Sequence, residues 1–206
     1  MKDDTIGDFL DQLAARVPAP GGGASAALSA AQAAALLSMV ARYSTGEKYA
    51  EHAETVRAVL AESETARDRA VQLAQDDAAA FAAVSQAYTL PKATPEEKAA
   101  RTAAIARALA GAAQPPAATI TTAAHLVDLA EILLPISNRN VITDVAVAAE
   151  LARAAATAAR LNVEINLAGL TDEDARRPLL DALAGVDELV TRADKVTAAV
   201  REAISR

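Results

Sequence analysis

The residues best suited to chemistry are a few polar side chains that stand among apolar neighbours in an alanine-rich chain. Carboxylates exchange protons, a lysine binds an anion or moves a proton, and side-chain amides donate and accept hydrogen bonds at once. Such groups are costly to bury without partners, so they often face a cleft. The candidates are Asp77, Lys92, Asn138, Asn140, Asp144, Asn162 and Asn166, together with the three glycines at 21–23.

Helical spacing groups several of these candidates. Asp77 lies four residues from an apolar side chain on either side, so it shares an apolar helix face and must be paired, hydrogen-bonded or turned to a cleft. Asn162 and Asn166 are four residues apart and share one face. Asp144 falls in the first turn of the same expected helix, where the helix dipole favours its ionised form. Amides in this arrangement suit the edge of a pteridine or a similar heterocycle.

Five of these side chains also have a purely structural interpretation. Asn138 and Asn140 are typical of an ordinary turn. Asp144 is equally typical of a helix start, and Asp77 of a carboxylate that joins two helices. Lys92, in an expected loop, is solvated by default.

Other chemistries lack the residues that they need. The chain has no cysteine, which excludes disulfides, thiol nucleophiles and thiolate metal sites. His52 and His125 have no ligand spacing with each other or with a carboxylate, so we expect no metal. The serines lack a nucleophile turn with a partner histidine, and the glycines at 21–23 lack the lysine that ends a phosphate-binding loop.

Composition predicts an all-α protein. Of the 206 residues 52% are hydrophobic and only 2% aromatic, a balance that favours long alanine-rich helices packed closely in one domain, residues 1–206. Because small side chains bury little area, we expect a homodimer. The net charge of −7 argues against nucleic acid, and an acidic small molecule would need a local basic patch.

The uncharged stretch 24–41 is long enough for a membrane span, but its alanines, serines and Gln32 favour a buried core helix, so we expect no membrane contact. The start of the chain lacks the pattern of a secretory signal, and a cytoplasmic location is the simplest expectation.

Helical periodicity and breaker residues predict the elements that position the candidates. Pro115 and Pro116 are expected to kink or break one helix, Thr143 to cap another, and Thr94 to start one with a capping box. The expected helices cover 5–17, 24–43, 47–88, 94–113, a resumed stretch to about 133, 144–166, and 172 to the end.

Seven short segments, spread over about residues 5 to 170, stand out together. They are Pro18-Ala-Pro-Gly-Gly-Gly-Ala-Ser25, Met39-Val-Ala41, Gly46-Glu-Lys-Tyr49, Asp77-Ala-Ala-Ala-Phe81, Leu90-Pro-Lys-Ala-Thr-Pro-Glu-Glu-Lys98, Asn138-Arg-Asn-Val-Ile-Thr-Asp144 and Asn162-Val-Glu-Ile-Asn-Leu167. In this order and spacing they resemble the signatures of the formiminotransferase-cyclodeaminase family of folate enzymes. The chain length resembles that of bacterial methenyltetrahydrofolate cyclohydrolases more than that of the fused bifunctional enzyme.

The resemblance implies an all-helical homodimer with a folate cleft and one of two reactions. In the one we favour, water opens 5,10-methenyltetrahydrofolate to 10-formyltetrahydrofolate; in the other, 5-formimidoyltetrahydrofolate cyclises with loss of ammonia. Both pass through a tetrahedral carbon between N5 and N10, so they need proton transfer and no bound cofactor or metal. A hypothesis of another class is a non-catalytic helical dimer that binds a ligand or a protein.

The resemblance also implies roles for individual residues. Asp144 is the first choice for general acid/base with Asp77 in support, and Lys92 anchors a carboxylate or moves a proton. The substrate-binding residues that it implies are Pro20, Gly21, Gly22, Gly23, Lys48, Asn138, Arg139, Asn140 and Asn166.

Four positions depart from the family pattern. Ser137 stands where glycine is usual, Glu47 where a basic residue is usual, and Ala146 where glycine is common. Arg139 adds a charge between two asparagines, and it either compensates for Glu47 in binding an acidic tail or changes the ligand. These departures affect the expected substrate more than the expected fold.

Overall fold

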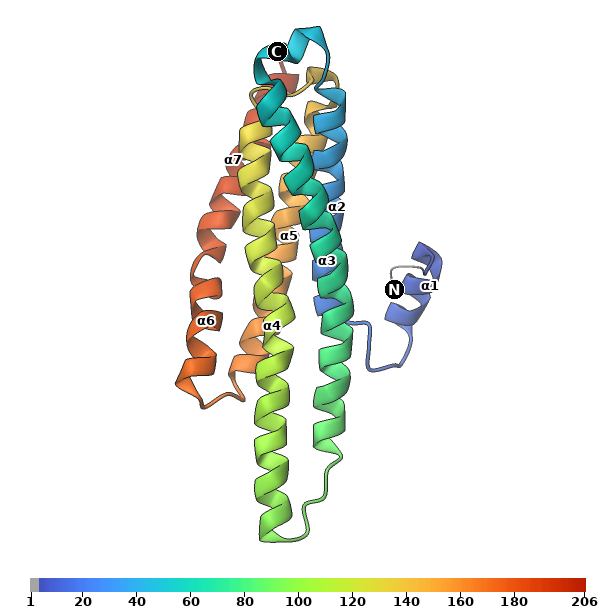
Figure 1. The fold of residues 1–206 in the computed structure, drawn as a ribbon, viewed down its shortest axis with the longest axis vertical. Helices are drawn as coiled ribbons and strands as arrows, with labels where there is room; N and C mark the ends of the chain where they lie inside the picture. Colours follow the sequence, from blue (N-terminus) through green and yellow to red (C-terminus); the bar gives the residue numbers. More distant parts are fainter. Residues whose placement is uncertain (1–3) are drawn as a thin grey trace.

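The computed structural model describes residues 4–206, and within them every regular element is helical (Figure 1). Four long helices lie side by side along one axis and run alternately up and down, and the last two helices pack against two of them. The elements are α1 (Ile6–Ala14), α2 (Gly22–Tyr43), the 3₁₀ helix η1 (Glu47–His52), α3 (Ala53–Tyr88), α4 (Pro95–Leu133), the 3₁₀ helix η2 (Arg139–Val141), α5 (Ile142–Leu167), α6 (Glu173–Ala184) and α7 (Val186–Ile204).

Helix α2 lies at the centre of the bundle, where it contacts α3, α4 and α5. By length and composition it is the one helix among the described residues that could cross a membrane. It is instead buried on several faces by the other helices, as expected for a small-residue core helix. Alanine permits this close packing because its methyl group keeps the backbones of neighbouring helices near one another.

Helices α3 and α4 form a hairpin that extends past the N-terminal end of α2 (Figure 1). Their 36 and 39 residues correspond to about 54 and 58 Å of helix, against about 33 Å for the 22 residues of α2. The start of α4 is the predicted capping box. The Thr94 hydroxyl accepts from the Glu97 amide at 3.2 Å, and the Glu97 carboxylate accepts from the Thr94 amide at 3.1 Å.

Pro115 and Pro116 were expected to kink or break the helix, and the break is not found, because α4 is one continuous helix across both. Both prolines are buried in the bundle, so packing on the neighbouring helices offsets the loss of two backbone hydrogen bonds. One carbonyl freed in this way, that of Ala112, finds a partner outside its own helix: Nδ2 of Asn166 in α5 donates to it at 3.4 Å.

Three smaller expectations also need correction. Thr143 does not cap α5, because η2 precedes that helix and Val141 is its N-cap residue. The expected last helix is two helices, α6 and α7, separated at Gly185. The first six residues of the expected 47–88 helix form η1.

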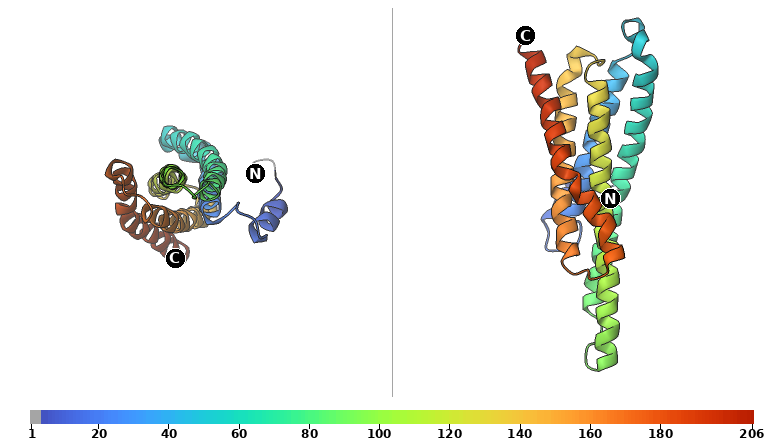
Figure 2. Two further views of the ribbon diagram at one scale, coloured as in Figure 1. Left: turned by 90° about the horizontal axis from the view of Figure 1, so that it is seen from below. Right: turned by 90° about the vertical axis from the view of Figure 1, so that its left-hand side faces the viewer.

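Helix α1 stands to one side of the bundle in Figure 1 and in the left view of Figure 2, and it buries none of its residues. It ends at Ala14, three residues earlier than expected.

Candidate active site

A cleft of about 590 Å³ opens where the start of α2 meets α3, the middle of α4 and the end of α5. Its walls come from four separate parts of the chain. The Ala19–Pro20 peptide that leads into it is cis. The lining residues are Pro18, Ala19, Gly21, Gly22, Gly23, Asp77, Phe81, Val84, Tyr88, Leu109, Ala112, Asn162, Ile165, Asn166, Ala168 and Gly169.

Asp77 and Gly23 form the polar end of the cleft. A Cβ atom on Gly23 would overlap the Asp77 carboxylate, so glycine is required for the carboxylate to reach the first turn of α2. Burial raises the pKa of Asp77 above its ordinary value, and the backbone N–H of Ala24 opposes this by favouring the charged form. Asp77 therefore joins α3 to α2, and it also faces the cleft as a carboxyl group with a raised pKa.

Two asparagines on α5 form the wall next to the glycines. Asn162 lies against Gly22, with both amide atoms 3.8 Å from a Cβ built there. Its Nδ2 donates to the carbonyl of Ala158 at 2.9 Å, while Nδ2 of Asn166 donates to the carbonyl of Asn162 at 2.7 Å. Asn166 also donates to the Ala112 carbonyl that Pro116 leaves free. These bonds fix both amide groups at the edge of the cleft.

Apolar and aromatic side chains form the rest of the cleft. Phe81, Val84 and Tyr88 are at i, i+3 and i+7 on one face of α3, and Leu109 and Ile165 face the same space from α4 and α5. The rings of Phe81 and Tyr88 are 47% and 53% exposed, although the protein has only five aromatic residues. Exposed rings beside a hollow are available to stack on a flat ligand.

The single chain does not bring the three predicted catalytic residues together. Asp77 lies in the cleft, Lys92 is exposed in the connection at the tip of the α3–α4 hairpin, and Asp144 is in the first turn of α5. The start of α5 is at the opposite end of the bundle from that tip (Figure 1). The length of α4 therefore separates Lys92 from Asp144 within one chain by roughly 50 Å.

The predicted substrate-binding residues also fall into two groups, one at the cleft and one at the other end of the bundle. The three glycines and Asn166 line the cleft, and buried Pro20 adjoins it. Lys48, Asn138, Arg139 and Asn140 lie at the other end, beside Asp144.

At that other end, two of the predicted residues have structural partners. Asn138 joins two connections, because its Nδ2 donates to the carbonyl of Tyr43 at 3.0 Å and its Oδ1 accepts from the amide of Asn140 at 3.0 Å. Arg139 donates to the carbonyl of Ala203 at 3.2 Å. Both contacts are those of ordinary connecting residues.

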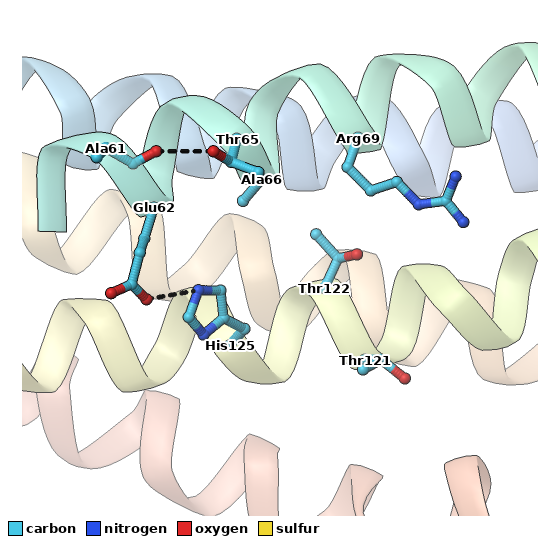
Figure 3. Close-up of a pocket in the computed structure, with 8 residues that line it drawn as sticks. All are labelled: Ala61, Glu62, Thr65, Ala66, Arg69, Thr121, Thr122 and His125. Carbon is cyan, nitrogen blue, oxygen red and sulfur yellow. Dashed lines mark hydrogen bonds and ion pairs between the residues drawn. The ribbon is translucent and has the colours of Figure 1, made fainter. Parts of the chain in front are cut away.

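A second hollow, of about 450 Å³, lies between α3 and α4 (Figure 3). Glu62 and His125 pair across it at 3.1 Å. The hydroxyls of Thr65 and Thr122 donate to carbonyls of their own helices, at 2.9 Å each. This hollow contains no residue of the predicted site, and it offers few polar groups that are free to bind a ligand.

Six lining residues were not singled out as candidates from the sequence: Val84, Tyr88, Leu109, Ala112, Ala168 and Gly169. The first two could have been found, since they repeat the helical spacing of Phe81 on the face that contains Asp77. Leu109 and Gly169 meet only through the packing of α4 on α5, for which the sequence has no local signal.

The fold is all-helical, and a cleft lies at the N-terminus of its central helix. Residues 5–184 match the profile of the formiminotransferase-cyclodeaminase family, and the chain belongs to that family.

Similar proteins come from bacteria and animals. The chain is 44% identical to methenyltetrahydrofolate cyclohydrolase of Methylorubrum extorquens over 185 residues, which are 89% of each protein. It is 36% identical to formimidoyltransferase-cyclodeaminase of Rattus norvegicus over 172 residues, but spans only 32% of that longer protein. The crystal structure of formiminotetrahydrofolate cyclodeaminase from Thermotoga maritima superposes with a TM-score of 0.84 at 29% identity, covering 97% of this chain and 98% of the other.

Proposed function

We propose that this protein is an enzyme of folate one-carbon metabolism that hydrolyses 5,10-methenyltetrahydrofolate to 10-formyltetrahydrofolate. The observation that supports this most is a cleft in which a carboxyl group of raised pKa faces glycines and fixed amides. The bacterial cyclohydrolase, similar over most of both chains, favours this reaction over its alternatives. A soluble protein of the cytoplasm fits this role.

The proposed reaction needs one proton acceptor and one proton donor. Water adds to the methenyl carbon and loses a proton to a base. The C–N5 bond then breaks as N5 gains a proton, while the new hydroxyl loses its proton to solvent and becomes the formyl oxygen. The raised pKa of Asp77 suits both steps, because the group accepts the first proton more readily than an ordinary carboxylate and can return it to N5. Asn162 and Asn166 orient the heterocycle, and no metal or bound cofactor takes part.

The second candidate reaction is the cyclisation of 5-formimidoyltetrahydrofolate with release of ammonia. The fold match to the Thermotoga maritima cyclodeaminase favours it. The same carbon is attacked, here by N10, which loses its proton; the imino nitrogen takes up that proton and one from solvent and leaves as ammonia. Asp77 would again accept a proton and then return it.

We propose further that the active form is a homodimer whose two chains lie antiparallel. A twofold axis perpendicular to the bundle would place Lys92 of one chain near Asp144 of the partner subunit, although one chain keeps them at opposite ends. Exposed apolar side chains on α5 support such an association: Leu161 and Ile165 are 65% and 72% exposed near the cleft. Lys92 and Asp144 keep their predicted roles only in this arrangement.

Replacing Asp77 by asparagine tests the proposed function. Loss of the methenyl chromophore above the buffer rate reports the hydrolysis, and ammonia release reports the cyclodeaminase reaction. We expect Asp77→Asn to lower kcat/KM by about a hundredfold, within the usual range for acid/base groups. The wild-type rate should also fall as the pH drops through the raised pKa of Asp77, because protonation removes the base; the variant should lack this limb.

Asp76→Asn is the matched control. Asp76 is the adjacent carboxylate, accepts a hydrogen bond from Gln72 at 2.8 Å, and does not line the cleft. The kcat/KM of Asp76→Asn should stay within about twofold of the wild-type value. Absence of both activities in the wild type, with folate still bound, would contradict the enzyme proposal and favour a binding protein.

A further inference from the structure

At the hairpin end of the cleft, the side chain of Arg101 packs on Tyr88. The guanidinium carbon lies 5.5 Å from the centre of the Tyr88 ring, and Nη2 donates to the Tyr88 carbonyl at 3.1 Å. Nε of Arg101 is buried and donates to no atom of residues 4–206. The guanidinium of Arg101 is half-buried and has no carboxylate partner among the described residues, so the donors that remain exposed beside Tyr88 can bind an anionic ligand.

Many arginines of this protein are already paired with carboxylates. Examples are Arg153 with Glu150 at 2.5 Å and Arg160 with Asp187 at 2.7 Å. Arg101 differs from them because it lies beside the cleft and its direct contact is an aromatic ring. That ring holds the guanidinium plane in place, which lowers the entropy lost when a carboxylate binds.

The charge of the hairpin supports the same interpretation. Between residues 79 and 111 the acidic residues are Glu96 and Glu97, and Glu97 is engaged in the capping box. The same stretch contains four basic residues: Lys92, Lys98, Arg101 and Arg107. In a protein of net charge −7, this end of the cleft is therefore the local basic patch that an anionic ligand needs.

The order of groups along α3 matches the order of groups in a folate. Asp77 marks the polar end, Phe81 and Val84 the apolar middle, and Tyr88 with Arg101 the far end. From Asp77 to Tyr88 the helix rises about 16 Å. That length accommodates a bicyclic heterocycle, then a benzoyl ring, then an amino acid, in line.

We propose that Tyr88 and Arg101 bind the benzoyl-glutamate end of the substrate, with the guanidinium of Arg101 on a glutamate carboxylate. This inference rests on the proposed folate function and adds a direction to it: the pterin lies at the glycines and the tail points to the hairpin tip. The pair acts in binding and does not touch the reacting carbon. Its removal therefore raises KM and leaves kcat nearly unchanged.

The test combines an Arg101→Ala variant with a substrate that has no glutamate. KM and kcat are measured for 5,10-methenyltetrahydrofolate and for the matching pteroate compound, which ends at the benzoyl carboxylate. We expect the variant to raise KM for the folate by about tenfold or more and to change KM for the pteroate by less than about twofold. For the wild type, KM for the pteroate should exceed KM for the folate by about the same factor by which Arg101→Ala raises KM for the folate.

Arg57→Ala is the control, because Arg57 is an exposed arginine near the start of α3, far along that helix from the cleft, and should leave all values unchanged. Arg101→Lys should have a folate KM between those of the wild type and Arg101→Ala, since lysine keeps the charge but lacks the planar guanidinium. An equal rise of KM for folate and pteroate in Arg101→Ala would show a structural role and overturn the proposal. An unchanged folate KM would also overturn it.

A binding measurement separates failure of this inference from failure of the proposed reaction. Calorimetry with folic acid and pteroic acid needs no turnover. Tighter binding of folic acid by the wild type, lost in Arg101→Ala, supports the tail site even if neither reaction is catalysed. Equal affinity of the wild type for the two compounds, or no binding of either, contradicts the tail site.

Discussion

At the scale of single residues, the missing side chain of Gly23 makes room for the carboxylate of Asp77. The two residues are 54 positions apart in sequence, yet the contact joins the first turn of α2 to the middle of α3. The carboxylate thereby reaches the backbone N–H of Ala24 in the first turn of α2 while staying at the edge of the cleft. Its position, and therefore its pKa, depends on a glycine that itself has no functional group.

Gly23→Ala should accordingly inactivate the protein without unfolding it. The new methyl group overlaps the carboxylate, which must turn away from the α2 start, and we expect kcat/KM to fall by about tenfold or more. Circular dichroism should show unchanged helix content, because alanine favours a helix more than glycine does.

The matched control for this substitution is Gly111→Ala. Gly111 is exposed within α4 and has no atom within 4 Å of a built Cβ. Its activity should equal that of wild type, and its unfolding free energy should rise by about 0.5–1 kcal/mol. Full activity in Gly23→Ala would show that the Asp77 position is not needed.

At the scale of elements, the sequence predicts most helices because the signals are local. Thr94 starts α4 by a capping box that four consecutive residues contain, and the uncharged stretch that becomes α2 has the composition of a core helix. The errors arise where tertiary packing outweighs local preference. Pro115 and Pro116 remain inside a continuous α4 because the surrounding helices bury them.

The same elements explain which part of the site is predictable. Asn162 and Asn166 share a face by spacing alone, and Tyr88 repeats the spacing of Asp77 and Phe81 closely enough to be found. The contact between Gly23 and Asp77 depends on how α2 packs on α3, for which no short stretch has a signal. The helices can thus be predicted from local sequence, whereas the contacts that form the site depend on how the helices pack.

At the scale of the whole molecule, the up-and-down course of the chain separates residues that the sequence analysis placed in one pocket. Lys92 follows α3 and Asp144 begins α5, so one length of α4 lies between them. A second chain in antiparallel orientation brings the two ends together, and this is the physical reason to propose a dimer.

Light scattering tests that proposal. We expect a mass of about twice the 21.1 kDa of one chain at assay concentration. A monomer with full activity would contradict the dimer and would also remove Lys92 and Asp144 from the reaction.

We propose that folate binds in the cleft between the glycines, Asp77 and Asn166. A crystal structure with a bound, non-hydrolysable analogue of 5,10-methenyltetrahydrofolate tests it most directly. We predict that the pterin lies against Gly22 and Gly23 with its one-carbon position within hydrogen-bond reach of the Asp77 carboxylate, directly or through one water. An analogue bound instead in the hollow between Glu62 and His125, with the cleft empty, would contradict the claim.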